Sequence, residues 1–211
     1  MIIVLLGPPG AGKGTQADKL AATLSIPKIA TGDVLRAALR DGTARGREAK
    51  AFMDRGDLVP DSVIFGILRD VMSSPAAEKG AILDGAVRTV PQAKELGIML
   101  AELGRGVDRV LLFDISDDKL TERLGGRTVC EKCQTPYMGR EPGTKCEKCG
   151  SLLMRRKDDE PEAIRNRLKV YRAQTAPVID WYGEHGMKVQ KVDADGPVGE
   201  VTARALKALE P

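Results

Sequence analysis

The sequence predicts an α/β protein of the three-layer α/β/α kind, with a five-stranded parallel sheet between two layers of helices. Two observations support this. Short apolar runs alternate with stretches of helical periodicity along the 211 residues, and the first apolar run leads directly into a glycine-rich turn. Crossover connections of this kind place the strands parallel in a doubly wound sheet. Ligands bind such sheets at the carboxyl ends of the strands, so we expect functional residues there.

Five short segments are expected to form the sheet: residues 1–6, 26–30, 81–85, 109–114 and 188–192. Beyond a helix after the first turn, we expect helices at residues 34–39, 45–55, 61–71, 91–103, 117–124, 162–185 and 198–209. Asp61 is the expected cap of its helix. Three of these helices form an insertion between two strands. Residues 125–160 break the alternation, because they are rich in glycine and proline and lack apolar periodicity.

The first turn, Gly7-Pro8-Pro9-Gly10-Ala11-Gly12-Lys13-Gly14-Thr15, has the composition and context of a phosphate-binding loop (P-loop). Its glycines let backbone N–H groups turn toward an anion, and the helix that follows adds partial positive charge. Lys13 is expected to reach the β- and γ-phosphates. Gly14 follows the lysine, so Thr15 is the candidate hydroxyl for a magnesium shell. The loop predicts that a nucleotide polyphosphate binds, but not how it is used.

All four cysteines lie within one short segment, as Cys130-x2-Cys133 and Cys146-x2-Cys149. Two such pairs, with glycine and proline between them, favour a tetrahedral zinc site. Four thiolates leave no open coordination position, so this metal would be structural. The alternative is two redox pairs, or free thiols.

Arginines lie at the ends of several expected elements: Arg36, Arg88, Arg123, Arg127, Arg156 and Arg167. Phosphoryl transfer needs fixed positive donors around the moving group, and the planar guanidinium binds phosphate oxygens in pairs. Asp84-Gly85, at a strand end, is a candidate carboxylate for holding magnesium through water. Asp158 and Asp159 follow a basic run and are interpreted as a charged hinge or clamp, although such runs are usually solvated.

Composition limits the function classes. The chain is 42% hydrophobic and 30% charged, which is typical of soluble globular proteins. A net charge of +3 implies no general attraction to nucleic acid or membranes. The N-terminal apolar run is short and lacks a basic leader, so we expect no signal peptide and a cytoplasmic location.

Taken together, these motifs resemble the adenylate kinase family, in its long form with a zinc-binding lid of four cysteines. The resemblance covers the whole chain. Besides the phosphate loop and the cysteines, it rests on Thr31-Gly32-Asp33-x-x-Arg36, Gly56-Asp57-Leu58-Val59-Pro60-Asp61, Asp84-Gly85-x-x-Arg88-Thr89 with Gln92, Arg123-x-x-Gly126-Arg127, Arg156-Lys157-Asp158-Asp159, Arg165-x-Arg167-Leu168 and Gln174-Thr175-Ala176-Pro177.

The resemblance implies reversible, magnesium-dependent phosphoryl transfer, in which ATP and AMP give two ADP as the protein closes over both nucleotides. It also implies three parts. The core comprises residues 1–29, 60–125 and 161–211, the AMP-binding insertion residues 30–59, and the zinc-binding lid residues 126–160. The implied cofactors are Mg²⁺ with ATP and a structural Zn²⁺. The implied partners are ATP, AMP and ADP, with no nucleic acid or membrane, and the protein is expected to be a monomer.

The resemblance also implies site residues, each carried over at a matching position. The ATP site would comprise Gly10, Ala11, Gly12, Lys13, Gly14, Thr15, Arg123, Arg127 and Pro197. The AMP site would comprise Thr31, Gly32, Arg36, Leu58, Val59, Gly85, Arg88, Gln92, Arg156 and Arg167. The catalytic set would be Lys13, Asp84, Arg88, Arg123, Arg156 and Arg167. Asp158 and Asp159 would close the lid, and Cys130, Cys133, Cys146 and Cys149 would bind the metal.

One departure keeps an alternative open. The family usually has Phe-Pro between the strand-end glycine and the arginine, where this chain has Ala86-Val87. The alternative is a nucleoside monophosphate kinase that prefers another acceptor or donor, such as UMP, CMP or GTP. A zinc module that binds nucleic acid under nucleotide control is a further alternative, although the lid has no aromatic interleaving beyond Tyr137.

Overall fold

The central element is a five-stranded, all-parallel sheet. The computed structural model describes residues 1–210, apart from the side chain of Arg45. The strands are β1 (Ile2–Leu6), β2 (Lys28–Ala30), β3 (Ala81–Asp84), β4 (Arg109–Asp114) and β8 (Val189–Asp193), in the order β2-β3-β1-β4-β8. The central strand β1 sets Val4 opposite Leu83 of β3 and Val110 of β4. The predicted five-stranded parallel sheet is therefore confirmed.

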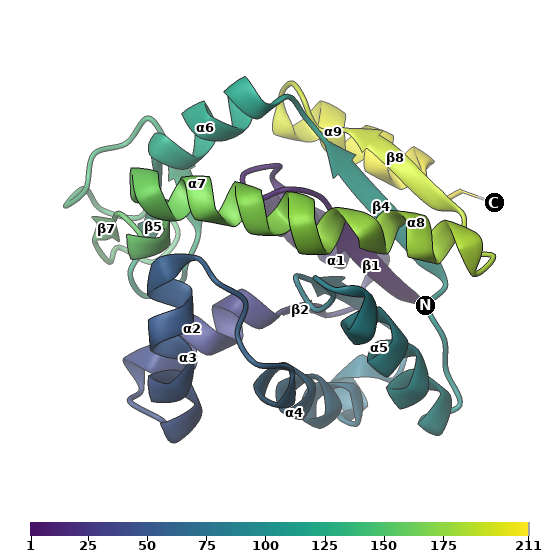
Figure 1. Ribbon diagram of the computed structural model, residues 1–211. Helices are drawn as coiled ribbons and strands as arrows, with labels where there is room; N and C mark the ends of the chain where they lie inside the picture. Colours follow the sequence, from purple (N-terminus) through teal and green to yellow (C-terminus); the bar gives the residue numbers. More distant parts are fainter. Residues whose placement is uncertain (211) are drawn as a thin grey trace.

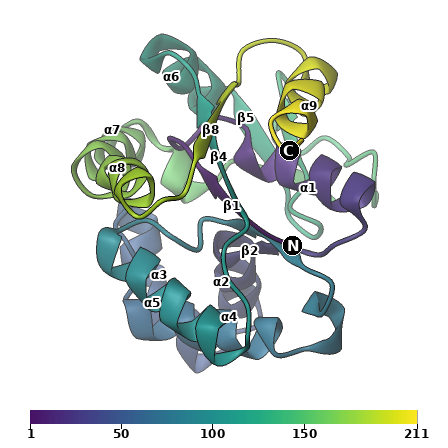
Figure 2. The same cartoon turned by 90° about the vertical axis from the view of Figure 1, so that its right-hand side faces the viewer.

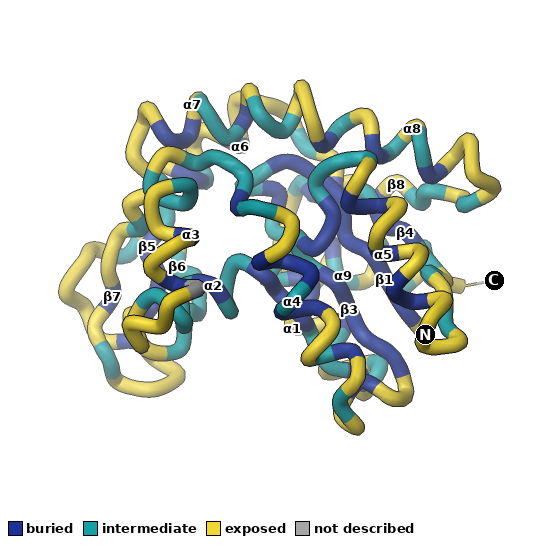
Figure 3. Tube along the Cα trace, turned by 60° about the horizontal axis from the view of Figure 1, so that its bottom comes forward, coloured by how far each residue is buried: buried dark blue, intermediate teal, exposed yellow. Residues whose placement is uncertain are grey.

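Helices cover both faces of the sheet, which is why the central strand β1 is apolar throughout, whereas the edge strand β8 carries Gln190 and Lys191. Alternate residues of β1 point to opposite faces: Ile2 and Val4 join one apolar cluster, and Ile3 and Leu5 join the other. The first face packs against α4 (Asp61–Met72), α5 (Val90–Glu102) and α8 (Ala176–Glu184). The second packs against α1 (Lys13–Leu24), α6 (Asp117–Gly125) and α9 (Val198–Lys207). Figure 2 shows α8 and α9 on opposite sides of the strands, and Figure 3 shows the buried sheet between the more exposed helices.

The insertion after β2 contains α2 (Thr31–Arg40), α3 (Ala44–Arg55) and α4, followed after α4 by the short helix η1 (Pro75–Ala77). Helix α2 begins at Thr31, three residues before the expected start, and carries Asp33 in its first turn, where the helix dipole favours a carboxylate. Asp61 was expected to cap α4, but it is the first helical residue and the extended Pro60 precedes it. Its carboxylate instead accepts a hydrogen bond from Gln92 of α5, at 2.6 Å.

The expected helix 162–185 is one long rod (Figure 1), and it contains an irregular turn. Helix α7 (Pro161–Val170) continues into a π-helical turn, η3 (Tyr171–Thr175), and then into α8. In this turn the N–H of Ala176 donates to the carbonyl of Tyr171, five residues earlier. Pro177 has no N–H and its ring crowds the preceding turn, which accounts for the wider turn at this point.

Residues 127–154 form a small domain-like unit with its own sheet, which periodicity did not predict. Strand β5 (Arg127–Cys130) pairs antiparallel with β6 (Pro136–Met138) and β7 (Leu153–Met154). Only Cys130, Cys146 and Leu153 form its buried apolar cluster, with Cys133 and Tyr137 packed against it. A core this small needs additional support, such as a metal. A short 3₁₀ helix, η2 (Lys157–Asp159), connects the unit to α7.

Candidate active site

The glycine-rich turn connects β1 to α1 and has the backbone that an anion-binding loop requires. Gly10 and Gly12 have positive φ angles of 88°, and a Cβ on Gly7 would lie 2.4 Å from the carbonyl oxygen of Phe113. The Lys13 ammonium donates to the carbonyls of Gly7 and Pro8, at 2.7 and 2.9 Å. The loop therefore wraps around its own lysine at the N-terminus of α1.

Lys13 lies in an unfavourable place for a cation. Burial, with the positive charges of Arg88 and Arg167 adding to it, lowers the pKa of Lys13 from 10.5 to about 8. Asp84 opposes this shift. A bound anion would relieve both the desolvation and the repulsion, so the electrostatics of the site favour a phosphate ligand.

A single cavity of about 720 Å³ joins the phosphate loop, the strand ends, the insertion, the Cys-rich unit and α7. Most of the site residues expected from the sequence line this cavity: Gly10, Ala11, Gly12, Lys13, Gly14, Thr15, Gly32, Arg36, Leu58, Val59, Asp84, Gly85, Arg88, Gln92, Arg123, Arg127, Arg156, Asp158 and Arg167. Of the other residues expected to bind nucleotide or close the lid, Thr31, Asp159 and Pro197 do not line it, and of the four cysteines only Cys133 does. Thr31 is fully buried and donates to the Gly85 carbonyl at 2.9 Å, so it supports the cavity wall from behind.

Asp159 joins two arginines of the cavity. Its carboxylate accepts two hydrogen bonds from Arg127, at 2.7 and 2.5 Å, and one from Arg167, at 2.9 Å. Only 3% of the Asp159 side chain is exposed, so water screens these charges weakly. Neighbouring Asp158 lies 3.2 Å from Arg167. Burial by itself would raise the pKa of Asp158, but the guanidinium groups, Arg167 foremost, outweigh it and lower that pKa.

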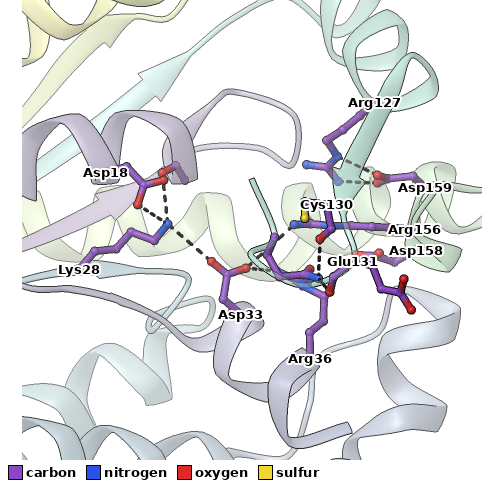
Figure 4. Close-up of polar contacts among 12 residues, drawn as sticks. Asp18, Lys28, Asp33, Arg36, Arg127, Cys130, Glu131, Arg156, Asp158 and Asp159 are labelled. Carbon is purple, nitrogen blue, oxygen red and sulfur yellow. Dashed lines mark hydrogen bonds and ion pairs between the residues drawn. The ribbon is translucent and has the colours of Figure 1, made fainter. Parts of the chain in front are cut away.

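A second ionic group surrounds Asp33 (Figure 4). Arg36 pairs with the Asp33 carboxylate at 2.5 Å, Lys28 lies 3.5 Å from it and Arg156 lies 4.0 Å from it. Lys28 also binds Asp18 of α1 at 2.8 Å. Burial and neighbouring guanidiniums, Arg36 first among them, lower the pKa of Arg156 below its ordinary value. Sequence analysis gave no role to Lys28, Asp18 or Asp33, and the only signal was the position of Asp33 in the Thr-Gly-Asp motif.

Arg88 is held by its backbone and its side chain. Its N–H donates to the Gln92 side-chain oxygen at 2.7 Å, and its carbonyl accepts from the Thr175 hydroxyl at 2.8 Å. Its Nε donates to the Gly85 carbonyl at 3.2 Å. Burial lowers the pKa of Arg88, and the charge of Arg167 adds to that shift. The preceding pair, Ala86-Val87, is buried in the core, so the segment reaches the cavity without the family's Phe-Pro.

Arg123, at the end of α6, donates to the carbonyl of Ala194 at 3.1 Å. Ala194, Gly196 and Val198 also line the cavity, whereas Pro197 lies between two lining residues. This side of the cavity is therefore formed by the segment that connects β8 to α9, beside the phosphate loop.

The four cysteine sulfurs lie within 4.8 Å of one another, and all four thiols are free. Cys130 and Cys149 are 3.3 Å apart, and Cys133 and Cys146 are 3.6 Å apart. Zinc–sulfur bonds of about 2.3 Å in a tetrahedron place the sulfurs about 3.8 Å apart, so this donor set fits zinc. Within residues 1–210, no helix is both long and apolar enough to cross a bilayer.

A phosphate loop, a strand-end carboxylate and six arginines around one cavity define a nucleotide-binding protein of the phosphoryl-transfer class. Comparison with known proteins narrows this class. The family model described as Adenylate kinase matches residues 5–187, so the chain belongs to the adenylate kinase family.

Several curated proteins named Adenylate kinase are similar to the chain over nearly its full length. The protein from Gemmatimonas aurantiaca is 62% identical over 211 residues, with 99% of both chains covered. The protein from Acidothermus cellulolyticus is 48% identical, covering 99% of this chain and 98% of the relative. The protein from Methanothrix thermoacetophila is 46% identical at the same coverage. The chain is therefore an enzyme of the phosphotransferase class.

Proposed function

We propose that this protein catalyses reversible phosphoryl transfer between ATP and AMP, giving two ADP. The observation that carries the proposal is the single cavity. The phosphate loop lines it together with the strand-end and insertion residues around Gly85 and Arg36, and six arginines line the same cavity. Two nucleotides bound there would meet with their phosphates facing each other. Family membership supports the same reaction and gives no support to another acceptor or donor.

On the donor side, the loop amides and Lys13 would hold the β- and γ-phosphates of ATP. Arg123 and Arg127 would lie against the same nucleotide, near the segment around Pro197. On the acceptor side, Arg36 and Arg88 would bind the AMP phosphate. The other acceptor-side residues are Thr31, Gly32, Leu58, Val59, Gly85 and Gln92.

Arg156 and Arg167 would stabilise the charge that develops on the transferred group. Arg156 lies in the segment that connects the Cys-rich unit to the core and Arg167 lies on α7, and both pair with carboxylates in the structure. Asp158 and Asp159 hold the Arg167 guanidinium, and Asp159 also holds Arg127, so these carboxylates would couple closure of residues 126–160 to assembly of the arginine cluster. Closure would exclude water, so that the phosphoryl group passes to AMP and not to hydroxide.

The donor sets fit the two proposed metals. Thr15 and Asp84 present oxygen atoms to the cavity beside the phosphate loop, and Mg²⁺ prefers oxygen ligands. Magnesium would neutralise charge on the ATP phosphates. The four-sulfur cluster would hold a structural Zn²⁺, which would stiffen the lid without contacting substrate.

We further propose three parts: a core, an AMP-binding insertion at residues 30–59 and a lid at residues 126–160. We also propose a monomer, located in the cytoplasm, that has no nucleic-acid or membrane partner. The near-balanced net charge of +3 supports this last point.

The test is phosphoryl transfer from magnesium ATP to AMP, with UMP, CMP and GMP as competing acceptors. We expect AMP to be the best acceptor. Lys13→Ala should lower kcat by about 100-fold or more, because it removes a fixed charge from the developing phosphate. Lys19→Ala, on the exposed face of the same helix, is the matched control and should leave kcat unchanged. Faster turnover of UMP than of AMP would overturn the proposal.

A further inference from the structure

The irregular turn in the long rod touches the active site through one hydroxyl. Thr175 is the last residue of the π turn, and its hydroxyl donates to the Arg88 carbonyl at 2.8 Å. The two residues come from distant parts of the sequence, and 7% of Thr175 is exposed. Both line the cavity, and Thr175 belongs to no site proposed above.

The turn has a local cause. Pro177 cannot donate to the carbonyl four residues earlier, and its ring crowds that carbonyl. The N–H of Ala176 therefore donates five residues back, to Tyr171. One extra residue per turn rotates everything that follows by about 100° relative to α7. At the end of this turn, the Thr175 side chain reaches the loop that carries Arg88.

The contact completes the immobilisation of Arg88. Gln92 of α5 accepts from the Arg88 N–H, Thr175 donates to the Arg88 carbonyl, and the Arg88 Nε donates to Gly85. Both backbone groups of one residue are therefore fixed by side chains from two different helices. The preceding Ala86-Val87 contains no proline to restrict the loop, so these contacts determine where the guanidinium lies.

We propose that Thr175 is a positioning residue for the acceptor site: through the Arg88 backbone it sets the guanidinium that binds the acceptor phosphate. Arg167, which projects from α7 just before the turn, lies close enough to Arg88 for their charges to repel. The rod therefore fixes both arginines, one directly and one through Thr175. This inference rests on the proposed function, because it assigns Arg88 to the AMP phosphate.

The test compares Thr175→Val, which keeps the shape and removes the hydroxyl, with Thr175→Ser, which keeps the hydroxyl. Losing one hydrogen bond should lower kcat/KM for AMP by about three- to tenfold in the valine variant. KM for ATP should stay within about twofold of wild type, since the phosphate loop is untouched, and the serine variant should recover AMP kinetics. Thr23→Val is the matched control, because the Thr23 hydroxyl bonds only within exposed α1.

A second measurement is independent of turnover. In the NMR spectrum, the Nε–Hε signal of Arg88 should be sharp in wild type and in Thr175→Ser, and broadened in Thr175→Val. Three results would each overturn the inference. These are AMP kinetics in Thr175→Val equal to those of wild type, equal impairment of the AMP and ATP kinetics in Thr175→Val, and a Thr175→Ser variant as impaired as Thr175→Val. A wild-type protein that does not phosphorylate AMP would instead defeat the proposed function, and the Arg88 signal would still test the contact.

Discussion

The lowered pKa of Lys13 predicts that ATP binding takes up a proton from solution. In the free protein, burial and neighbouring arginines hold the pKa of Lys13 at about 8. Phosphate oxygens favour the charged ammonium, so binding should return the pKa to at least its ordinary value of 10.5. Between these two values free Lys13 is partly neutral, whereas bound Lys13 is protonated.

The magnitude follows from the two pKa values. At pH 7 the free amine is about 90% protonated, and ATP binding should take up about 0.1 proton. The uptake should rise to about 0.5 proton at pH 8 and about 0.9 proton at pH 9. The dissociation constant for ATP should increase about tenfold for each pH unit above 8, because binding then needs a proton that the free protein has lost.

The same shift sets the sign of a stability effect. Lys13 binds its proton more weakly in the folded state than in the unfolded state, so the charged lysine destabilises the fold at pH values below 8. That cost is relieved as the pH rises from 8 toward 10.5, since the unfolded chain then holds more protons than the folded one. The Lys13 contribution to the free energy of unfolding should therefore increase across this range.

The assay is isothermal titration calorimetry with ATP in the absence of AMP, at each pH, in buffers of different ionisation enthalpy. The slope of the observed enthalpy against the buffer enthalpy gives the protons taken up. Lys13→Arg is the control, because a guanidinium stays protonated over this range and uptake should disappear. An uptake below about 0.2 proton at pH 9 in wild type would refute the reasoning, as would an unchanged uptake in the arginine variant.

Two further predictions concern the lid. Asp159→Asn removes a carboxylate that binds both Arg127 and Arg167 and whose side chain is only 3% exposed. We therefore expect the free energy of unfolding to fall by about 3–5 kcal/mol and the Tm to fall by roughly 6–20 °C. Glu147→Gln is the control: it breaks the ion pair with Arg140 in the lid, where the Glu147 side chain is 73% exposed, and should change Tm by less than about 3 °C. Equal Tm shifts in the two variants would contradict the argument that burial makes the Asp159 contacts strong. Removing the metal with a strong chelator should unfold the Cys-rich unit before the five-stranded sheet, because the apolar cluster of that unit is very small. Loss of amide-exchange protection in residues 127–154 would report this unfolding. Unchanged protection in metal-free protein would argue against structural zinc.

Local patterns were enough to predict the architecture. Short runs bounded by turn residues located all five strands, and β1 was the clearest because a strand buried on both faces is apolar throughout. The phosphate loop was equally clear, since its glycines and Lys13 act within a few residues of one another. The cysteine spacing predicted a four-sulfur cluster for the same reason, and the structure brings all four sulfurs together.

The ends and the regularity of helices were predicted less well where residues distant in the sequence determine them. Asp61 looked like a helix cap, but Gln92 from a later helix takes its carboxylate. The rod 162–185 appeared uniform, although Pro177 opens a π turn within it. Each of these outcomes depends on a hydrogen bond or steric contact that periodicity does not record.

The order of the residues was enough to say which chemical groups this protein has and roughly which strand ends carry them. How those groups pair became clear only in the folded chain. Lys28 with Asp18 and Asp33, and Thr175 with Arg88, come from segments that the sheet brings together. The energy of such pairs depends on distance and burial in the folded protein, and neither quantity is written in the order of the residues.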